Sequence, residues 1–378
     1  MRSSFWSGLF LITLLIPQLC LAAAPLAASV PPGRISANNH ISASYENATL
    51  TEDVTWRGIV VVQGALVVAP QATLRIDPGT EIRFSASKAS LNPARLVVLG
   101  RLQCVGTPDR PVHFTSNPAA PSKRGEWGGL LLLSSEKRNQ LEHCRIEGAE
   151  TGVEARFSTI SLKSVVISTA TTGMILRDSI AGMTTSTVSG CDTGIEAHDS
   201  ELEVRETTVA QNRRGAALYD SSVLLSSVKV AGNTLQGILA EECRIKLTSS
   251  EITGNGLGAE ISGGEGQVFL CRFMRNTDTA LHLASARLKV NHCQITDNLH
   301  DGLKLEDDSA TIWDNAFSGN GGYNLVNAGS ENITALQNWW GAMDESSVKK
   351  TLFDSTRDGR FGAVNVFPWL FEKPALLP

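Results

Sequence analysis

The sequence predicts an all-β protein, a single-stranded right-handed parallel β-helix of about 11–12 rungs. The first observation is an apolar column that recurs every 21 or 22 residues. The second is a glycine column with the same period, and a regular period this short is typical of a solenoid. The apolar column is Ile146, Ile167, Val188, Val209, Val230, Ile252, Phe273, Ile295 and Phe317. The second column is Gly152, Gly173, Gly194, Gly215, Gly237, Gly258, Ala280, Gly302 and Tyr323.

The third observation is that each period holds three short runs in which apolar and polar residues alternate, such as 195–197, 202–204 and 228–230. Alternation with a period of two predicts strands with one buried face. No stretch inside the period has helical spacing, which excludes leucine-rich and ankyrin repeats. Three strands per turn give a right-handed coil, roughly 50–55 Å long at about 4.8 Å per rung.

The turns between these strands carry repeated polar residues. Asn tolerates the left-handed conformation, and stacked amides can hydrogen-bond along a coil. We therefore expect turn chemistry at both repeats below, rather than a strip of ligand-binding residues. The Asn turn contains Asn212, Asn233, Asn255, Asn276, Asn298 and Asn320. The Asp-Ser turn contains Asp178-Ser179, Asp199-Ser200, Asp220-Ser221 and Asp308-Ser309.

Four segments are expected along the chain. Residues 1–24 form a signal peptide, 25–48 a flexible leader and N-terminal cap, 49–338 the β-helix, and 339–378 a C-terminal capping segment. A coil needs caps because its terminal strand edges would otherwise be open to association. A short helix is expected over 344–352.

The N-terminal signal predicts export to the periplasm or the extracellular space. Arg2 supplies the positive charge, 9–16 the apolar core and 22–24 small residues for cleavage. Cys20 follows a poor match to a lipobox, so a lipid anchor is the less favoured alternative. No later stretch reaches the length of a transmembrane helix.

Composition excludes several classes of protein. The net charge is −5 and no basic patch is present, which argues against a nucleic-acid partner. No Cys or His cluster has the spacing of a zinc site, so neither a metal site nor a cofactor is expected. Nothing in the sequence specifies an oligomeric state.

Six cysteines follow the signal peptide, and an even number in an exported chain permits disulfides. Cys144, Cys271 and Cys293 each lie two residues before the apolar column, so we expect them to point into the core. Buried free thiols are favoured. A disulfide between Cys271 and Cys293, on neighbouring rungs, is the alternative.

Several segments carry a family resemblance. Residues 49–84 and 99–129 are similar to the opening rungs of exported bacterial right-handed β-helix proteins of the pectate-lyase-like superfamily. Residues 338–341 and 367–370 resemble the terminal segment of the same group. The resemblance implies the fold and export. It leaves activity open, because the superfamily includes lyases, hydrolases, epimerases and adhesin-like proteins.

Two clusters of chemistry-bearing residues are expected on the strand that follows the glycine, where the resemblance places enzyme sites. The candidate binding residues are Glu196, His198, Tyr219 and Glu241. The candidate catalytic residues are Glu260, His282, Lys304 and Glu306. A lyase needs a base and a cation to stabilise the anion that it forms, and Ca²⁺ is expected only in that case. Solvated surface charge is the alternative interpretation of both clusters.

The even period favours binding over catalysis, because it leaves few insertions to wall an active-site cleft. Only 85–95 and 116–126 depart from it. We therefore expect a non-catalytic envelope protein that presents a rigid face to a polysaccharide or a surface protein. A polysaccharide lyase or glycoside hydrolase acting on an acidic polysaccharide is the alternative.

Overall fold

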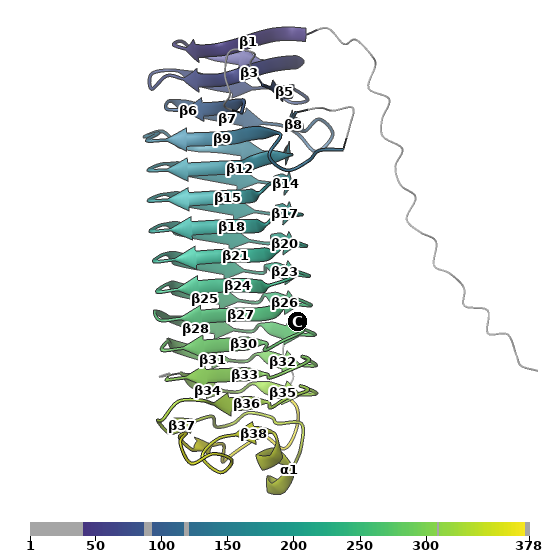
Figure 1. Ribbon diagram of the computed structural model, residues 1–378, viewed down its shortest axis with the longest axis vertical. Helices are drawn as coiled ribbons and strands as arrows, with labels where there is room; N and C mark the ends of the chain where they lie inside the picture. The colour runs from purple at the N-terminus through teal and green to yellow at the C-terminus, as the bar shows by residue number, and fades with distance from the viewer. Residues whose placement is uncertain (1–40, 87–92, 117–120, 308–309, 375–378) are drawn as a thin grey trace, which may run out of the picture. The chain divides into compact units, whose positions relative to one another are not determined.

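The computed structural model describes residues 41–86, 93–116, 121–307 and 310–374. The predicted signal peptide and most of the leader lie outside these residues. The described chain is a right-handed parallel β-solenoid of about 12 turns with one short helix, which confirms the predicted fold class (Figure 1). Strand pairing begins at β1 (Ile41–Leu50), ahead of residue 49, and β1 pairs in parallel with β3 (Ile59–Val68).

Each turn contributes one strand to each of three stacks. The first two stacks, with β1 and β3, form a 25-stranded sheet, and the third is a 12-stranded sheet. The first stack is β5 (Glu81–Ser85), β8 (Val112–Thr115), β11 (Cys144–Glu147), β14 (Val166–Ser168), β17 (Thr187–Ser189), β20 (Thr208–Ala210), β23 (Lys229–Ala231), β26 (Glu251–Thr253), β29 (Arg272–Met274), β32 (Gln294–Thr296) and β35 (Ala316–Ser318).

The second stack follows the Asn turn and holds the predicted sites. It is β6 (Arg95–Val98), β9 (Trp127–Leu133), β12 (Ala149–Arg156), β15 (Thr172–Arg177), β18 (Thr193–His198), β21 (Arg214–Tyr219), β24 (Gln236–Glu241), β27 (Leu257–Ser262), β30 (Leu281–Ala284), β33 (Leu303–Glu306), β36 (Leu325–Asn327) and β38 (Leu352–Phe353).

The third stack completes each turn. It is β2 (Val54–Trp56), β4 (Thr73–Ile76), β7 (Arg101–Val105), β10 (Asn139–Glu142), β13 (Thr159–Lys163), β16 (Ile180–Thr184), β19 (Glu201–Arg205), β22 (Ser222–Ser226), β25 (Arg244–Thr248), β28 (Glu265–Phe269), β31 (Arg287–Asn291) and β34 (Thr311–Trp313). Near the C-terminus lie β37 (Ile333–Thr334), α1 (Glu345–Lys350) and β39 (Val364–Asn365), and α1 confirms the short helix predicted there.

The Asn turn forms the predicted ladder through the core. The side-chain amide of Asn233 donates to Oδ1 of Asn255 at 2.9 Å and to the carbonyl of Val209 at 3.3 Å. The backbone N–H of Asn233 donates to the same Oδ1 at 3.1 Å. Both Asn side chains are fully buried. The ladder therefore satisfies buried backbone groups where the chain bends.

The conformational reason that we predicted for this Asn is wrong. The residue in the left-handed region is the one before it, such as Gln211, with φ of 57°, and Gly232, with φ of 63°. In the Asp-Ser turn, too, the left-handed residue and the hydrogen-bonding residue are different. Asp199 has φ of 48°, and the hydroxyl of Ser200 accepts from the N–H of Ser179. One residue makes the bend and the next satisfies the backbone.

The glycine column packs against this ladder. A Cβ on Gly194 would lie 2.5 Å from the carbonyl oxygen of Gly215 and 3.0 Å from Nδ2 of Asn212. Glycine recurs here because the backbone approaches too closely for a side chain. The period in the sequence thus records a packing requirement.

Aromatic stacking fills both ends of the core. Near the N-terminus, the rings of Phe84 and Trp127 stack at 4.0 Å between centroids. Near the C-terminus, Trp340 is buried and stacks on Phe317 at 4.8 Å. Trp340 thus continues the core beyond the last regular rung and is not available on the surface.

All six cysteines of the described chain are free and buried. The predicted inward column of Cys144, Cys271 and Cys293 is confirmed, and the alternative Cys271–Cys293 disulfide is not formed. The sulfurs of Cys104 and Cys144 lie 3.2 Å apart. Burial raises the pKa of the Cys104 thiol well above its usual range, and the neighbouring Cys144 raises it further.

Candidate functional site

The candidate residues lie on the outward side of the second stack. We call this surface the lateral face and define it by two columns of residues in register. One column is Val67, Val97, Leu131, Glu154, Ile175, Glu196, Ala217, Leu239, Glu260, His282, Lys304, Val326 and Phe353. The other is Leu133, Arg156, Arg177, His198, Tyr219, Glu241, Ser262, Ala284 and Glu306.

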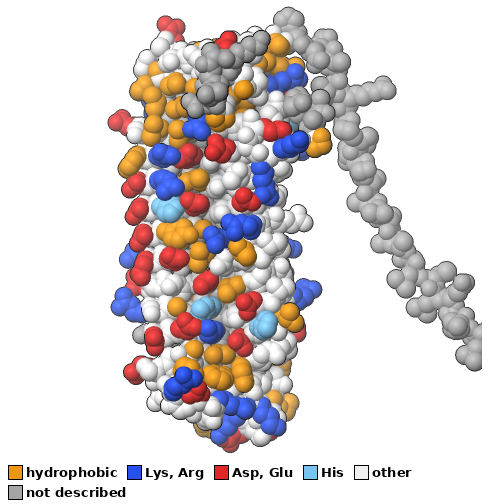
Figure 2. Space-filling model, in the orientation of Figure 1, with side chains coloured by type: hydrophobic (Ala, Val, Ile, Leu, Met, Phe, Trp, Pro, Cys, Tyr) orange, Lys and Arg blue, Asp and Glu red, His pale blue; other side chains and the backbone are white. Residues whose placement is uncertain are grey.

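The lateral face changes character along the coil. Figure 2 shows hydrophobic side chains gathered near both ends of this side of the molecule, with charged side chains of both signs between them. At the C-terminal end, Phe353 contacts Tyr323 at 5.4 Å and Phe361 at 5.6 Å between ring centroids. The face therefore offers apolar rings beside polar groups.

The structure brings together three of the four predicted binding residues. His198 Nε2 lies 2.9 Å from Oε1 of Glu196, and the His198 ring stacks on Tyr219 at 4.8 Å with an angle of 14°. Glu241 is exposed and lies beside Tyr219 in register, without a hydrogen bond to it. Burial raises the pKa of the Tyr219 phenol, although Arg214 lowers it, and the carboxylates of Glu241 and Glu196 contribute to the rise. This cluster is a stacked pair of rings with a carboxylate.

The four candidate catalytic residues also lie together. His282 Nδ1 is 3.9 Å from Oε1 of Glu260, and its Nε2 is 3.4 Å from Oε1 of Glu306. The ammonium group of Lys304 forms an ion pair with Glu306. The hydrogen bond from Lys304 lowers the pKa of Glu306. Both ring nitrogens of His282 face carboxylates, and Nε2 is buried.

This geometry limits the chemistry of the second cluster. A general base must reach a substrate proton with a free nitrogen, within about 3 Å. Nε2 of His282 is buried beside Glu306, and the Lys304 ammonium is bound to Glu306. None of the four hollows found among the described residues is lined by a residue of either cluster. Both clusters lie on an open surface.

Among the described residues, no group of three or more His, Cys, Asp or Glu side chains is placed to hold a metal ion. The described part of the chain also contains no helix long and apolar enough to span a bilayer.

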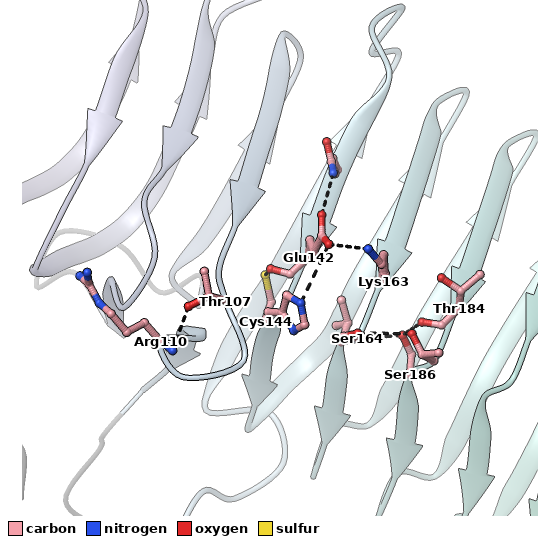
Figure 3. A network of polar contacts seen from close by, with 12 residues as sticks. Thr107, Arg110, Glu142, Cys144, Lys163, Ser164, Thr184 and Ser186 are labelled. Atoms are coloured by element: carbon pink, nitrogen blue, oxygen red, sulfur yellow. Dashed lines mark hydrogen bonds and ion pairs between the residues drawn. The ribbon is translucent and has the colours of Figure 1, made fainter. Parts of the chain in front are cut away.

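A third polar cluster, on the third stack, was missed in the sequence. Figure 3 shows Glu142 on β10 directed toward Lys163 on β13, and their charged atoms lie 2.8 Å apart. Gln140 donates to the other carboxylate oxygen at 3.2 Å, and His143 Nε2 lies 4.0 Å from Oε1. The hydrogen bond from Lys163 lowers the pKa of Glu142. The 21-residue spacing of Glu142 and Lys163 could have predicted this pair. It was overlooked because Glu142 precedes Ile146, the first residue of the apolar column.

A shallow hollow of about 550 Å³ on the third stack was also missed. Its lining runs from Thr159 on β13 to Gln267 on β28 and includes Gly182, where an added Cβ would meet no atom within 4 Å. We expected an even repeat to leave few insertions that could wall a cleft. The hollow forms without an insertion, and Gly182 leaves one position of its outward column without a side chain.

The described part of one insertion folds along the coil. Arg124 donates to the carbonyl of Gly190 at 3.1 and 2.9 Å and forms an ion pair with Asp192. Residues 121–126 therefore follow the edge formed by successive Asn turns. They do not enclose either candidate cluster.

The parallel coil, its polar turn ladders and its open lateral face define a solenoid of the right-handed β-helix class. The chain belongs to the right-handed β-helix family, because the family model described as "Right handed beta helix region" matches 114–239 and 193–339. A second model, "Pectate-lyase like beta helix domain", matches 46–157. No curated protein matches the chain.

Several solved structures are similar in fold. The periplasmic alginate epimerase AlgG is 11% identical, covers 84% of this chain and 78% of its own, and has a TM-score of 0.44. The A-module of the Azotobacter vinelandii mannuronan C-5 epimerase AlgE4 is 12% identical, with coverage of 74% and 86% and a TM-score of 0.40. An alginate lyase from Paenibacillus sp. is 10% identical, with coverage of 81% and 99% and a TM-score of 0.28. Likeness at this level concerns the fold only.

Proposed function

We propose that this protein is a non-catalytic, exported β-helix protein whose lateral face binds a polysaccharide or a surface protein at the cell envelope. The observation that carries the proposal is the lateral face itself, an open surface in register from Val67 to Phe353. An open face suits an extended polymer, which is bound through many small contacts. A small substrate is usually enclosed in a pocket.

The pairing of charges favours a neutral polysaccharide over an acidic one. Arg156 pairs with Glu154 at 2.5 Å, Arg177 with Glu196 at 3.5 Å, and Lys304 with Glu306. An acidic polymer would have to displace these carboxylates from their Arg and Lys partners. It would also be repelled by the carboxylates that stay in place. A neutral glycan can instead place its apolar ring faces on Tyr219 or Phe353 and its hydroxyl groups on the carboxylates.

A polysaccharide lyase or hydrolase is the second candidate. His282 favours it, because a largely buried histidine lies here beside two carboxylates, Glu260 and Glu306. Catalysis would require that the ring leave both carboxylates and that a cleft form above it. Ca²⁺ would then be expected on the carboxylates of this cluster.

Affinity electrophoresis in gels that contain neutral or acidic polysaccharides tests the proposal. We expect retardation by at least one neutral polymer, and weaker retardation in the Tyr219→Ala and Phe353→Ala variants. Lys246→Ala, on the third stack, is the matched control and should migrate like the wild type. Binding that is confined to acidic polymers, or equal in all four proteins, would contradict the proposed face.

Polysaccharide and protein partners are distinguished by a second assay. A binding signal from envelope extract that disappears after protease treatment, while purified glycans give none, would assign a protein partner. A signal that survives protease treatment and is weakened in Tyr219→Ala supports the polysaccharide.

A further inference from the structure

The third stack ends differently from the other two. Its last strand, β34, pairs with β31, whereas the next segment of chain, β37, pairs with β39. The place of a thirteenth strand is therefore not filled by a paired strand of the described chain. A hollow of about 700 Å³ lies there between β34 and the segment 331–337, with Pro368 at its edge.

The lining of this hollow combines one aromatic ring with neutral polar groups. Trp313 is partly buried and lines the hollow from β34. Asn332, Thr334 and Gln337 line it from the other side, and all three are exposed. Asn332 Oδ1 accepts from the N–H of Ala363 at 2.7 Å, and its amide nitrogen has no hydrogen bond to a described residue. Amide and hydroxyl groups are thus available beside an indole face.

The charge of the lining restricts the class of ligand. No Lys, Arg or His is among the described lining residues, and the single charged side chain is the carboxylate of Glu331. An anion would meet this carboxylate without a compensating cation. The apolar part of the wall, from Ile333 and Leu336, suits a ring with a hydrophobic face. The volume falls in the range of about 300–1,000 Å³ that is typical of small-molecule sites.

We propose that this hollow binds a neutral sugar unit, with a pyranose ring stacked on Trp313 and its hydroxyl groups on Asn332, Thr334 and Gln337. The choice of a glycan rests on the proposed function, and the residues are separate from the lateral face. The site would hold one end or one branch of a glycan whose main chain lies elsewhere on the coil.

Titration of the full chain with short oligosaccharides tests the site. The probes are cellohexaose, xylohexaose and maltohexaose, with hexagalacturonate as the anionic counterpart, read by calorimetry and tryptophan fluorescence. We expect a dissociation constant of about 0.1–1 mM for at least one neutral probe. Hexagalacturonate and the Trp313→Ala variant should each show affinity reduced by about tenfold or more.

Matched variants separate binding from folding. Phe371→Ala removes an aromatic ring that is 61% exposed and does not line the hollow, so its affinity should equal that of the wild type. Trp313→Phe keeps a ring and should lose less affinity than Trp313→Ala. Thr334→Val keeps the side-chain shape and loses only the hydroxyl. If Trp313→Ala fails to fold, reduced affinity in Thr334→Val supports the hollow, and unchanged affinity contradicts it.

The outcomes distinguish the two proposals. Binding lost in Trp313→Ala but kept in Phe353→Ala supports the hollow and contradicts the lateral face for that probe. Binding lost only in Phe353→Ala overturns the hollow and leaves the lateral face. No binding of any neutral hexasaccharide at about 10 mM also overturns the hollow, whatever the polymers show.

Discussion

The middle rungs and the C-terminal end of the coil use polar side chains in opposite ways. In the middle, buried amides such as Asn233 satisfy backbone groups of neighbouring turns, and the charges of the lateral face pair with each other. At the C-terminal end the third stack stops, and Trp313, Asn332 and Gln337 border a hollow. Where the period is kept, most polar side chains form hydrogen bonds or ion pairs within the coil. Where the period ends, such groups become available to a ligand.

Breaking the Asn ladder should have the largest effect. Asn255→Ala would leave the carbonyl of Val230 and the N–H of Asn233 without their partner inside the core. Two unsatisfied buried groups should lower the free energy of unfolding by about 3–4 kcal/mol. Denaturant unfolding followed by circular dichroism measures this.

The matched control for the ladder comes from the other region. Thr334→Val at the C-terminal end removes an exposed hydroxyl and should change the free energy of unfolding by less than about 0.5 kcal/mol. Equal losses in the two variants would remove the distinction between the regions.

Alkaline pH should produce the next largest effect. Burial raises the folded pKa of Cys104 and Cys293 well above the unfolded value near 9.0. A raised pKa gives stability that is fully present below pH 9 and is lost as pH rises, because the unfolded thiols ionise first. The slope should approach about 1.4 kcal/mol per pH unit for each thiol.

Unfolding measured between pH 8 and pH 10.5 tests this loss in the wild type and in Cys104→Ala, which should show a shallower slope. Identical slopes would show that these thiols ionise alike in both states. Native alkylation is a parallel measurement, in which no thiol should react before unfolding.

A smaller effect is expected from the stacked rings of the lateral face. Tyr219→Ala removes the ring that stacks on His198 and should lower the free energy of unfolding by about 0.5–1.5 kcal/mol. Tyr219→Phe keeps the stack and should retain nearly all of that stability. A comparable loss in both variants would assign the effect to the hydroxyl group and not to the stacked ring.

The smallest effect concerns the ion pair of Glu142 and Lys163. The hydrogen bond from Lys163 lowers the pKa of Glu142 below the unfolded value of 4.5. The resulting stability is present above that value and is lost as pH falls through the folded pKa. Lys163→Met should remove about 0.2–1 kcal/mol at neutral pH and less at pH 3. A loss that is independent of pH would instead indicate packing by the lysine stem.

The sequence predicted the fold well because the period is itself a packing requirement. Gly194 recurs because the backbone approaches closely there, and Asn212 recurs because its side chain satisfies backbone groups beside the bend. The alternation within strands fixes which residues point outward. The left-handed residue of the Asn turn was misplaced, because its identity varies among Gln, Gly, Arg and Asp and gives no column.

The candidate sites were less predictable. The strand register predicted that Glu260 lies beside His282. It did not predict the direction of the ring nitrogens, which depends on side-chain rotamers. The hollow that includes Gly182 forms on the third stack without an insertion, and the hollow at Trp313 lies where β37 pairs with β39. Neither feature leaves a pattern in the residue types.

The lateral face is proposed to bind a polymer without turnover. The most direct test is prolonged incubation of the purified protein with the polysaccharides that it retains, with and without Ca²⁺. Bound protein, new reducing ends and the ultraviolet absorbance of unsaturated products are recorded together. We expect binding by the wild type with no product above that of the His282→Ala and Lys304→Ala variants. Product that forms with the wild type and disappears in both variants would contradict it and establish an enzyme.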